Sequence, residues 1–467
     1  MPQNFRKAGT AALLTVLFAI GVLHWVFFYN LAHLSFTAYD WPKEFSYYSI
    51  IRQALIQHFI PFHISRAFQE TDRFLALPET LLSPQILLLP AMKIGQFAMF
   101  NTLFMYTLGF LGCLWLRKKY RLSFLPFLLL YLLFNFNGYI TSHIAVGHSM
   151  WNGYFLMPFF CLLIFTLMEG KKNISLVVIE FSFFLFFLIL QGSFHIFVWC
   201  LFFLALFGAF NRGHLKSISL IIVFSAVLSC FRLCPAAMTF YKKGYPFLFI
   251  SGYPGIKDFF NALATAREFT YRPFTLPMGW WEFDAYINII GVIFIAYFGI
   301  YLRFSKKQLL QNYKYRELDF PILLMALFSF GSLYSFVSKL PVPFLNSQRY
   351  SSRFFIVPLI LLLVISSLRL KELLPLLKKN KAFQLLAPAC VAVIAFSLAK
   401  HSYLWRIDNL ERHCGAGIAD FAIGNVIKND AAYINSVIIS AAVSLIAIVV
   451  LSCFYVYRAR KPHSKGN

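Results

Sequence analysis

Charged side chains are scarce in this chain. Lys, Arg, Asp and Glu make up 13% of its 467 residues, whereas hydrophobic residues make up 60%. The mean hydropathy is +0.68. A water-soluble domain needs many more polar and charged residues to cover its surface. The composition therefore excludes a soluble protein and indicates a polytopic membrane protein.

Acidic residues are scarcer than basic ones, with 18 Asp and Glu against 42 Lys and Arg, a net charge of +24. The basic residues cluster at alternate ends of successive apolar runs, which follows the positive-inside rule and places both termini in the cytoplasm. Such clusters grip the anionic inner leaflet, so we expect no nucleic-acid partner. The clusters are Arg6-Lys7, Arg117-Lys118-Lys119 with Arg121, Lys171-Lys172, Arg212 with Lys216, Lys306-Lys307, Lys378-Lys379 with Lys381, and Arg458-Arg460-Lys461.

The cysteines form no recognisable framework. Seven of the eight lie in apolar runs, and Cys414 alone lies in a loop. Neither metal-ligand spacing nor a disulfide pattern follows from these positions.

Long apolar runs, in contrast, recur along the whole chain. A helical span needs about 20 apolar residues. The first run has the positive start of a signal peptide but no small-residue cleavage site after it, so we expect it to stay as a span. The prediction is an all-α single transmembrane domain over 1–467 with about twelve helices. The predicted spans are 10–30, 95–116, 122–140, 150–168, 174–190, 193–210, 217–235, 286–304, 319–337, 353–370, 382–399 and 435–457.

The predicted outer loops are longer and more varied than the inner ones, and they hold most of the carboxylates. Loops carry sites, whereas helices position them, so the outer face is the expected working face. These segments are the first outer loop 31–94, the large outer loop 236–285, the segment 338–352 and the last outer loop 400–434.

The first outer loop has a pattern of its own. From 43 to 59, apolar residues recur at helical spacing against polar ones, which predicts an amphipathic helix in the membrane interface, ended by Pro61. A second interfacial or re-entrant piece, 81–94, is too short to span. Asp40 and Glu44 stand at the start of the first helix, where the first span ends. This pair of carboxylates is the best indication of chemistry in the sequence.

The large outer loop combines cations with aromatic rings, as a site for an amphiphilic polar ligand requires. Lys242 and Lys243 stand near its start, Arg272 further on, and Trp280 and Trp281 near its end. All five are candidate substrate-binding residues. For the tryptophan pair, an aromatic belt at the membrane boundary is an equally good interpretation.

Polar residues also mark the outer ends of two other helices. His143 and His148 are five residues apart, and Gln191 and His195 form a tight turn between the fifth and sixth spans. No Cys, Asp or Glu stands at matching spacing, so polar or capping roles are a better interpretation than a metal site. His148, His195 and Gln191 are further substrate-binding candidates.

Three arginines and one glutamate near or within spans complete the candidates. Arg349 and Arg353 would share one helix face, where two guanidinium groups favour a phosphate and snorkelling toward headgroups is the alternative. Glu180 and Arg232 are intramembrane charges, which are functional candidates by default, but the sequence shows no partner for either.

The layout is similar to the GT-C superfamily of integral-membrane glycosyltransferases. The similarity rests on Asp40 and Glu44 just after the first span, on interfacial helices in the first outer loop, and on many spans with outward-facing chemistry. The stretch from Gly147-His148 to Pro158 and the arginine turn at 349–353 also resemble the bacterial relatives that include YfhO-like proteins. The chain has no Asp-x-Asp at 39–44 and no large soluble C-terminal domain. The oligosaccharyltransferase branch, with its bound divalent metal, therefore fits poorly.

This resemblance implies transfer of a sugar from a polyisoprenyl-phosphate-linked donor to a cell-envelope glycan, lipid or protein at the outer face of a bacterial inner membrane. It makes Asp40 the candidate base and Glu44 the second. Arg349 and Arg353 are then the leading cations for the phosphate, with Arg272 or Lys242-Lys243 as substitutes. No cofactor is expected; a divalent metal stays open as an alternative that no motif supports.

Two other classes of function remain open. Twelve spans with both termini inside are also common in transporters, so a transporter or flippase for a lipid-linked or polar solute is the alternative. An acyl or phosphoglycerol transferase would need a histidine-based centre, for which His148 and His195 are the only material. It ranks last.

Overall fold

The fold is helical throughout. The computed structural model describes residues 3–33, 39–65, 71–240, 252–269, 279–304, 315–339, 350–411 and 424–460. These residues form helices joined by turns and loops, with isolated β-bridges and no β-strand. The predicted all-α class is confirmed.

Seven helical segments among the described residues are long and apolar enough to cross a membrane, and a bent pair makes an eighth. The chain is thus a multi-pass membrane protein, whereas about twelve spans stays a prediction. All twelve predicted ranges contain helix, but several are short or interrupted. α7 (Ile174–Leu190) is short. A break separates α14 (Asp319–Phe328) from α15 (Gly331–Val337). A bend of 119° separates α8 (Phe194–Phe210) from the segment Arg212–Leu228, which contains α9 (Leu215–Leu228).

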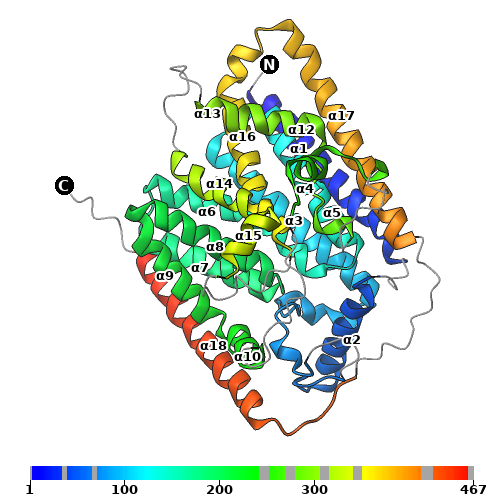
Figure 1. Cartoon of the computed structure of the whole chain (residues 1–467), viewed down its shortest axis with the longest axis vertical. Helices are drawn as coiled ribbons and strands as arrows, with labels where there is room; N and C mark the ends of the chain where they lie inside the picture. The colour runs from blue at the N-terminus through cyan, green and yellow to red at the C-terminus, as the bar shows by residue number, and fades with distance from the viewer. Residues whose placement is uncertain are drawn as a thin grey trace.

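The core is built around α16 (Ile356–Leu377), which lies at the centre of the bundle (Figure 1). In the most apolar 18 residues of the helical segment Ser351–Leu377, which contains α16, 94% of the residues are buried. This is expected for a helix that is hydrophobic on every face. It contacts α4 (Phe124–Asn135), α6 (Met157–Glu169) and α14. Truncation of a fully buried leucine there, such as Leu361→Ala, should cost about 2–5 kcal/mol.

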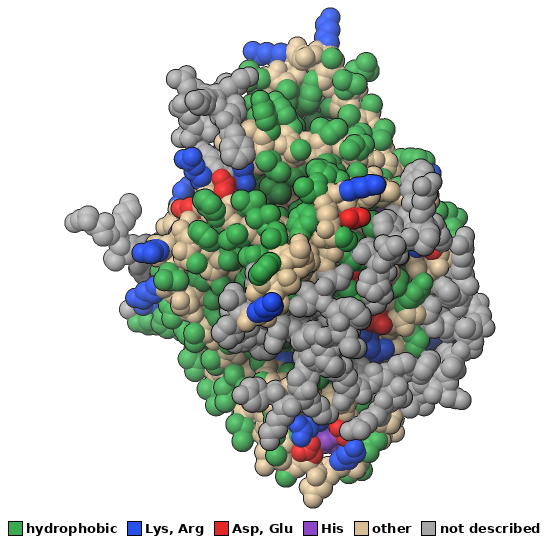
Figure 2. All heavy atoms as spheres, viewed as in Figure 1, with side chains coloured by type: hydrophobic (Ala, Val, Ile, Leu, Met, Phe, Trp, Pro, Cys, Tyr) green, Lys and Arg blue, Asp and Glu red, His purple; other side chains and the backbone are tan. Residues whose placement is uncertain are grey.

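Other long helices lie at the edges of the bundle. α17 (Lys381–Arg406) and α18 (Ala431–Arg460) line two sides of the view in Figure 1. Large apolar side chains such as Phe396 and Leu445 are exposed on them. Hydrophobic side chains cover much of the visible surface in Figure 2, as a surface facing lipid requires.

Ion pairs join helix ends that the charge pattern predicts to lie on the same side. Lys119, at the end of α3 (Ile94–Tyr120), lies 3.4 Å from Glu169 at the end of α6. Arg303 lies 2.9 Å from Asp319. The connections are consistent with the predicted alternation of the helices, while the side of the membrane that each end faces stays a prediction.

The first outer loop folds back onto the bundle. Its helix α2 (Trp41–Gln57) begins after Asp40 and ends at His58, which has a left-handed φ of 55°. α2 buries Tyr47, Ile50 and Ile51, three residues of the predicted apolar face. The later piece forms a 3₁₀ helix, η3 (Pro84–Ala91), which is too short to span. This loop positions the candidate site.

Candidate functional site

Asp40 lies in a compact group of charged side chains at the start of α2. Its Oδ2 is 3.0 Å from Lys43 Nζ and 3.2 Å from His148 Nε2. Lys43 Nζ is also 3.1 Å from Glu79 Oε2. The Asp40 side chain is 42% exposed, whereas that of Lys43 is 16% exposed. Lys43 therefore bridges two carboxylates, of which Asp40 is accessible to a substrate and held in a fixed position.

A close backbone approach brings Asp40 to His148. Asp40 N donates to Val146 O at 3.0 Å, and Trp41 Nε1 donates to Ala145 O at 3.3 Å. Gly147 has φ +86°, and a Cβ there would lie 2.4 Å from Trp41 N. Only glycine tolerates both conditions. The turn after α5 (Gly138–Ala145) can therefore lie directly against the start of α2.

Two residues from other parts of the chain, Gly192 and Arg232, pack against the backbone around Glu79 and fix its position. A Cβ on Gly192, which has φ +71°, would lie 2.2 Å from Glu79 O. Buried Arg232, on α10 (Cys230–Phe240), donates from Nη2 to Leu77 O at 2.7 Å and Thr80 O at 2.6 Å. Arg232, which had no evident partner in the sequence, thus clamps the segment that carries Glu79.

The two carboxylates of α2 have opposite electrostatic environments. Burial raises the pKa of Asp40, but hydrogen bonds and charges from His148 and Lys43 outweigh burial and hold that pKa well below its usual range. Glu44 is 2% exposed, and burial raises its pKa to about 8. Glu44 Oε2 accepts a hydrogen bond from Ser149 Oγ. The anionic form is therefore favoured at Asp40 and the neutral form at Glu44.

His148 extends the group inward. Its Nδ1 lies 2.8 Å from Nδ1 of His143, which is fully buried. Only one proton can lie between these two nitrogens, so one imidazole donates and the other accepts. Asp40, His148 and His143 form a continuous hydrogen-bonded chain that can pass a proton or fix the tautomer of His148.

Trp151, on η4 (Ser149–Leu156), connects this chain to the other candidates. The guanidinium carbon of Arg353 lies 4.8 Å above its ring, and the His195 ring stacks on it at 5.4 Å. His143 packs against the same indole at 4.7 Å. The structure thus brings His148, His195 and Arg353 together around one aromatic side chain.

Arg353 is held by a carboxylate. Its Nε and Nη2 both lie 2.5 Å from Glu282 Oε2. Trp281 Nε1 donates to Glu282 Oε1 at 3.1 Å, and Trp281 packs on Tyr39, the neighbour of Asp40. Trp280 is buried against Phe283. The tryptophan pair therefore packs within the protein and connects Arg353 to the start of α2.

Four candidate residues lie outside the described residues: Arg349, Arg272, Lys242 and Lys243. The same is true of Cys414. Their positions relative to Asp40 stay predictions.

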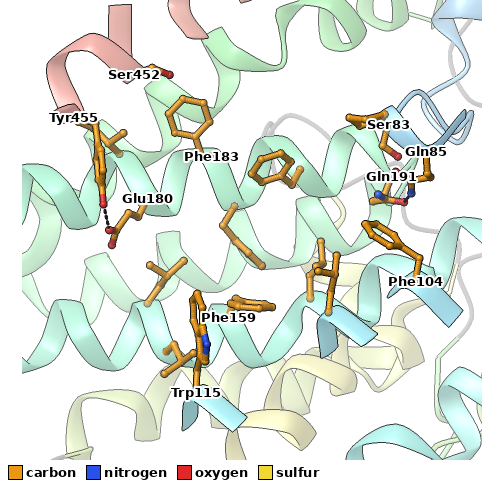
Figure 3. A pocket seen from close by; sticks show the side chains of 18 of the residues that line it. Ser83, Gln85, Phe104, Trp115, Phe159, Glu180, Phe183, Gln191, Ser452 and Tyr455 are labelled. Atoms are coloured by element: carbon orange, nitrogen blue, oxygen red, sulfur yellow. Dashed lines mark hydrogen bonds between the residues drawn. The ribbon is translucent and has the colours of Figure 1, made fainter. Parts of the chain in front are cut away.

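Gln191 lies at one end of a long apolar groove rather than beside Asp40. Gln85 Nε2 donates to Gln191 Oε1 and to Asn101 Oδ1, both at 2.9 Å. The groove, which we call groove 1, has a volume of about 1340 Å³ and is lined mainly by α3, α6 and α7 (Figure 3). From Phe100 to Lys119, α3 follows it for about 28 Å at about 1.5 Å per residue. That length is close to the hydrocarbon thickness of a bilayer, about 30 Å.

Groove 1 is polar at its ends and aromatic between them. Ser83, Gln85 and Gln191 lie at one end, and Glu180 and Tyr455 lie at the other, as Figure 3 shows. Tyr455 Oη donates to Glu180 at 2.8 Å, and Lys172 pairs with the same carboxylate. The intramembrane charge of Glu180 is thus neutralised by partners that the sequence did not reveal. Phe104 lies beside Gln191 at the first end, and Phe159 and Phe183 stand between the two ends.

Sequence reasoning missed four members of the site: Lys43, Glu79, Trp151 and Glu282. Lys43 follows Asp40 by three residues on a predicted helix, a spacing that could have revealed it. Glu79, Trp151 and Glu282 come from separate parts of the chain, and no sequence spacing connects them to Asp40. In the described part of the chain, no three His, Cys, Asp or Glu side chains are arranged to hold a metal ion.

Comparison with protein-family models, with curated proteins and with solved structures found no match to this chain.

Proposed function

We infer that the protein is a membrane glycosyltransferase of the GT-C type, which moves a sugar from a polyisoprenyl-phosphate-linked donor to an acceptor at the outer face of a bacterial inner membrane. The observation that carries this proposal is Asp40. It is an accessible carboxylate that contacts with Lys43 and His148 hold in position. It stands where the first outer loop meets the bundle.

The group around Asp40 suits a glycosyl transfer. Asp40 takes the proton of an acceptor hydroxyl. The acceptor oxygen forms a bond to the anomeric carbon while the bond from that carbon to the phosphate oxygen breaks, and the polyisoprenyl phosphate leaves with the electron pair. Arg353 and the imidazole of His195 are the nearby groups suited to stabilise the phosphate.

Groove 1 supports a lipid-linked donor. It is lined by aromatic and aliphatic side chains along a length similar to the bilayer thickness, so it can hold a long isoprenoid chain. Its Gln191 end is close to the site because Gly192 packs against the backbone of Glu79, and Leu82 N donates to Leu190 O at 2.9 Å. A donor chain in groove 1 would therefore deliver its phosphate toward Asp40 and His195.

The flippase alternative finds less support in the same groove. A headgroup crossing the membrane along it would pass Phe104, Phe159 and Phe183, which offer no hydrogen bonds. An unpaired polar group in an apolar environment costs several kcal/mol. The feature that favours transport is the hydrogen-bonded pair of Glu180 and Tyr455 at the end of groove 1 opposite Gln191, because polar groups within a membrane often mark a transport path.

The proposal is tested in proteoliposomes that contain the full chain and a polyisoprenyl-phosphate hexose. Asp40→Asn keeps the shape of the side chain and removes the base, and the Asp40 side chain makes no capping bond to α2 that the change could break. Asp258→Asn, on α11 (Ile256–Ala264), is the matched control. We expect transfer by the control and not by Asp40→Asn. Normal transfer by Asp40→Asn removes Asp40 from the mechanism.

A further inference from the structure

A second apolar groove opens beside α16. It has a volume of about 600 Å³ and lies between α11, α14 and the helix formed by α12 (Asn288–Phe294) and η8 (Ile295–Tyr301). We call it groove 2. Figure 2 shows a hollow lined by hydrophobic side chains at this place, between the positions of α12 and α14 in Figure 1. The π-helical turns of η8 line it, and such turns often occur at functional sites.

One end of groove 2 lies near the Arg353–Glu282 pair, which does not line it. Phe355, two residues after Arg353, lines the groove and contacts Phe259 with ring centroids 4.7 Å apart. Tyr253, which also packs on Phe259, donates to the carbonyl of Phe283, the residue after Glu282, at 2.9 Å. The groove therefore ends about one helical turn from the candidate phosphate-binding arginine.

The opposite end of groove 2 is bounded by a charged pair. Arg303 and Asp319 line the groove there and lie 2.9 Å apart. A hydrocarbon chain that enters at Phe355 thus has a defined end. The volume of groove 2 is less than half that of groove 1, so it suits a shorter chain.

We propose that groove 2 binds the acyl chain of the acceptor, so that the acceptor is a membrane lipid with a hydroxyl-bearing headgroup rather than a free glycan or a protein. This inference rests on the proposed function. A transfer reaction must bring two substrates to one base. The Gln191 end of groove 1 lies against the backbone of Glu79, the partner of Lys43. The Phe355 end of groove 2 lies two residues from Arg353, which Glu282 and Trp281 connect to Tyr39 beside Asp40. With the donor chain in groove 1, the acceptor headgroup reaches Asp40 from groove 2.

The inference is tested by photolabelling, which needs no turnover. The full chain is placed in nanodiscs of phosphatidylethanolamine and phosphatidylglycerol with a diacylglycerol that carries a diazirine on one acyl chain, and labelled peptides are identified by mass spectrometry. Ala296, an exposed residue that lines groove 2, is changed to Phe so that the ring fills the groove. Ala442→Phe, on the exposed face of α18, is the control for a bulky residue in contact with bulk lipid.

We expect labelling of peptides from 287–303 above the level found around Ala442, loss of that excess in Ala296→Phe, and retention of it in Ala442→Phe. Equal labelling of both regions, or no loss in Ala296→Phe, overturns the inference because groove 2 then holds only bulk lipid. Transfer assays separate the two proposals. Transfer to a water-soluble acceptor at the rate of a lipid acceptor refutes the acceptor assignment and leaves the glycosyltransferase standing. Specific labelling without any transfer refutes the glycosyltransferase instead.

Discussion

Glu44 should make the stability of this protein depend on pH in a direction opposite to that of most carboxylates. Its side chain is buried and its pKa is raised to about 8, against 4.5 in an unfolded chain. Between these values the folded state binds more protons than the unfolded state. The stabilisation is therefore fully present below pH 4.5 and is lost as the pH rises through about 8.

The size of the effect follows from the two pKa values. Each pKa unit corresponds to about 1.4 kcal/mol, so the free energy of unfolding should fall by an amount on the order of 5 kcal/mol over this range. The neutral form of Glu44 has nearly the shape of glutamine, which can still accept the hydrogen bond from Ser149 Oγ. Glu44→Gln should consequently lose this fall in the free energy of unfolding, and should be more stable than the natural protein at pH 9.

The assay is reversible unfolding by SDS titration in mixed micelles between pH 5 and pH 9. Glu268→Gln, which changes an exposed carboxylate that pairs with Lys400, is the control and should keep the slope of the natural protein. Equal slopes for the natural protein and Glu44→Gln would refute the reasoning, because Glu44 would then titrate as an ordinary carboxyl. Transfer activity at pH 7 should survive in Glu44→Gln, since the residue is already neutral there.

Three further predictions concern the site and the topology. Asp40→Asn should lower transfer by about 10²–10⁴-fold. Because the pKa of Asp40 is lowered, activity of the natural protein should fall only at a pH below the usual titration range of an aspartate, and a fall near pH 6 would contradict this. Arg353→Lys should weaken donor binding by roughly tenfold or more, because the planar guanidinium can bond Glu282 and a phosphate at the same time and an ammonium cannot reproduce that geometry. Normal binding at normal expression would move the phosphate to Arg272 or Lys242-Lys243. A membrane-impermeant thiol reagent applied to right-side-out vesicles should label Cys414, and labelling from the cytoplasmic side alone would overturn the orientation.

The main helices were predictable because apolar length and period are strong local signals. α2 illustrates this, since Tyr47, Ile50 and Ile51 are buried where the pattern placed them. The burial of Glu44 was missed, although it lies three, four and seven residues before Tyr47, Tyr48 and Ile51 and so shares their face. The prediction of the apolar face counted only apolar residues, so the carboxylate of Glu44 was not assigned to the buried side of α2.

Interrupted helices and contacts between distant segments were beyond sequence reasoning. The apolar run at 122–140 contains both α4 and the start of α5, because Asn137 caps a new helix through a bond from Ile140 N. The approach of Glu79 to Lys43 depends on the clamp of Arg232 and the turn at Gly192, which only the tertiary structure brings together. Local periodicity carries no information on such contacts.

The central claim is that a lipid-linked sugar donor binds with its phosphate at the outer site and its chain in groove 1. A cryo-electron-microscopy map of the full chain in nanodiscs with a polyisoprenyl-phosphate hexose tests it most directly. We expect phosphate density beside Arg353 and His195, the sugar against Asp40, and chain density past Gln191 along Phe104 and Phe159. Headgroup density beside Phe159, between the two ends of groove 1, would contradict the transferase and favour transport.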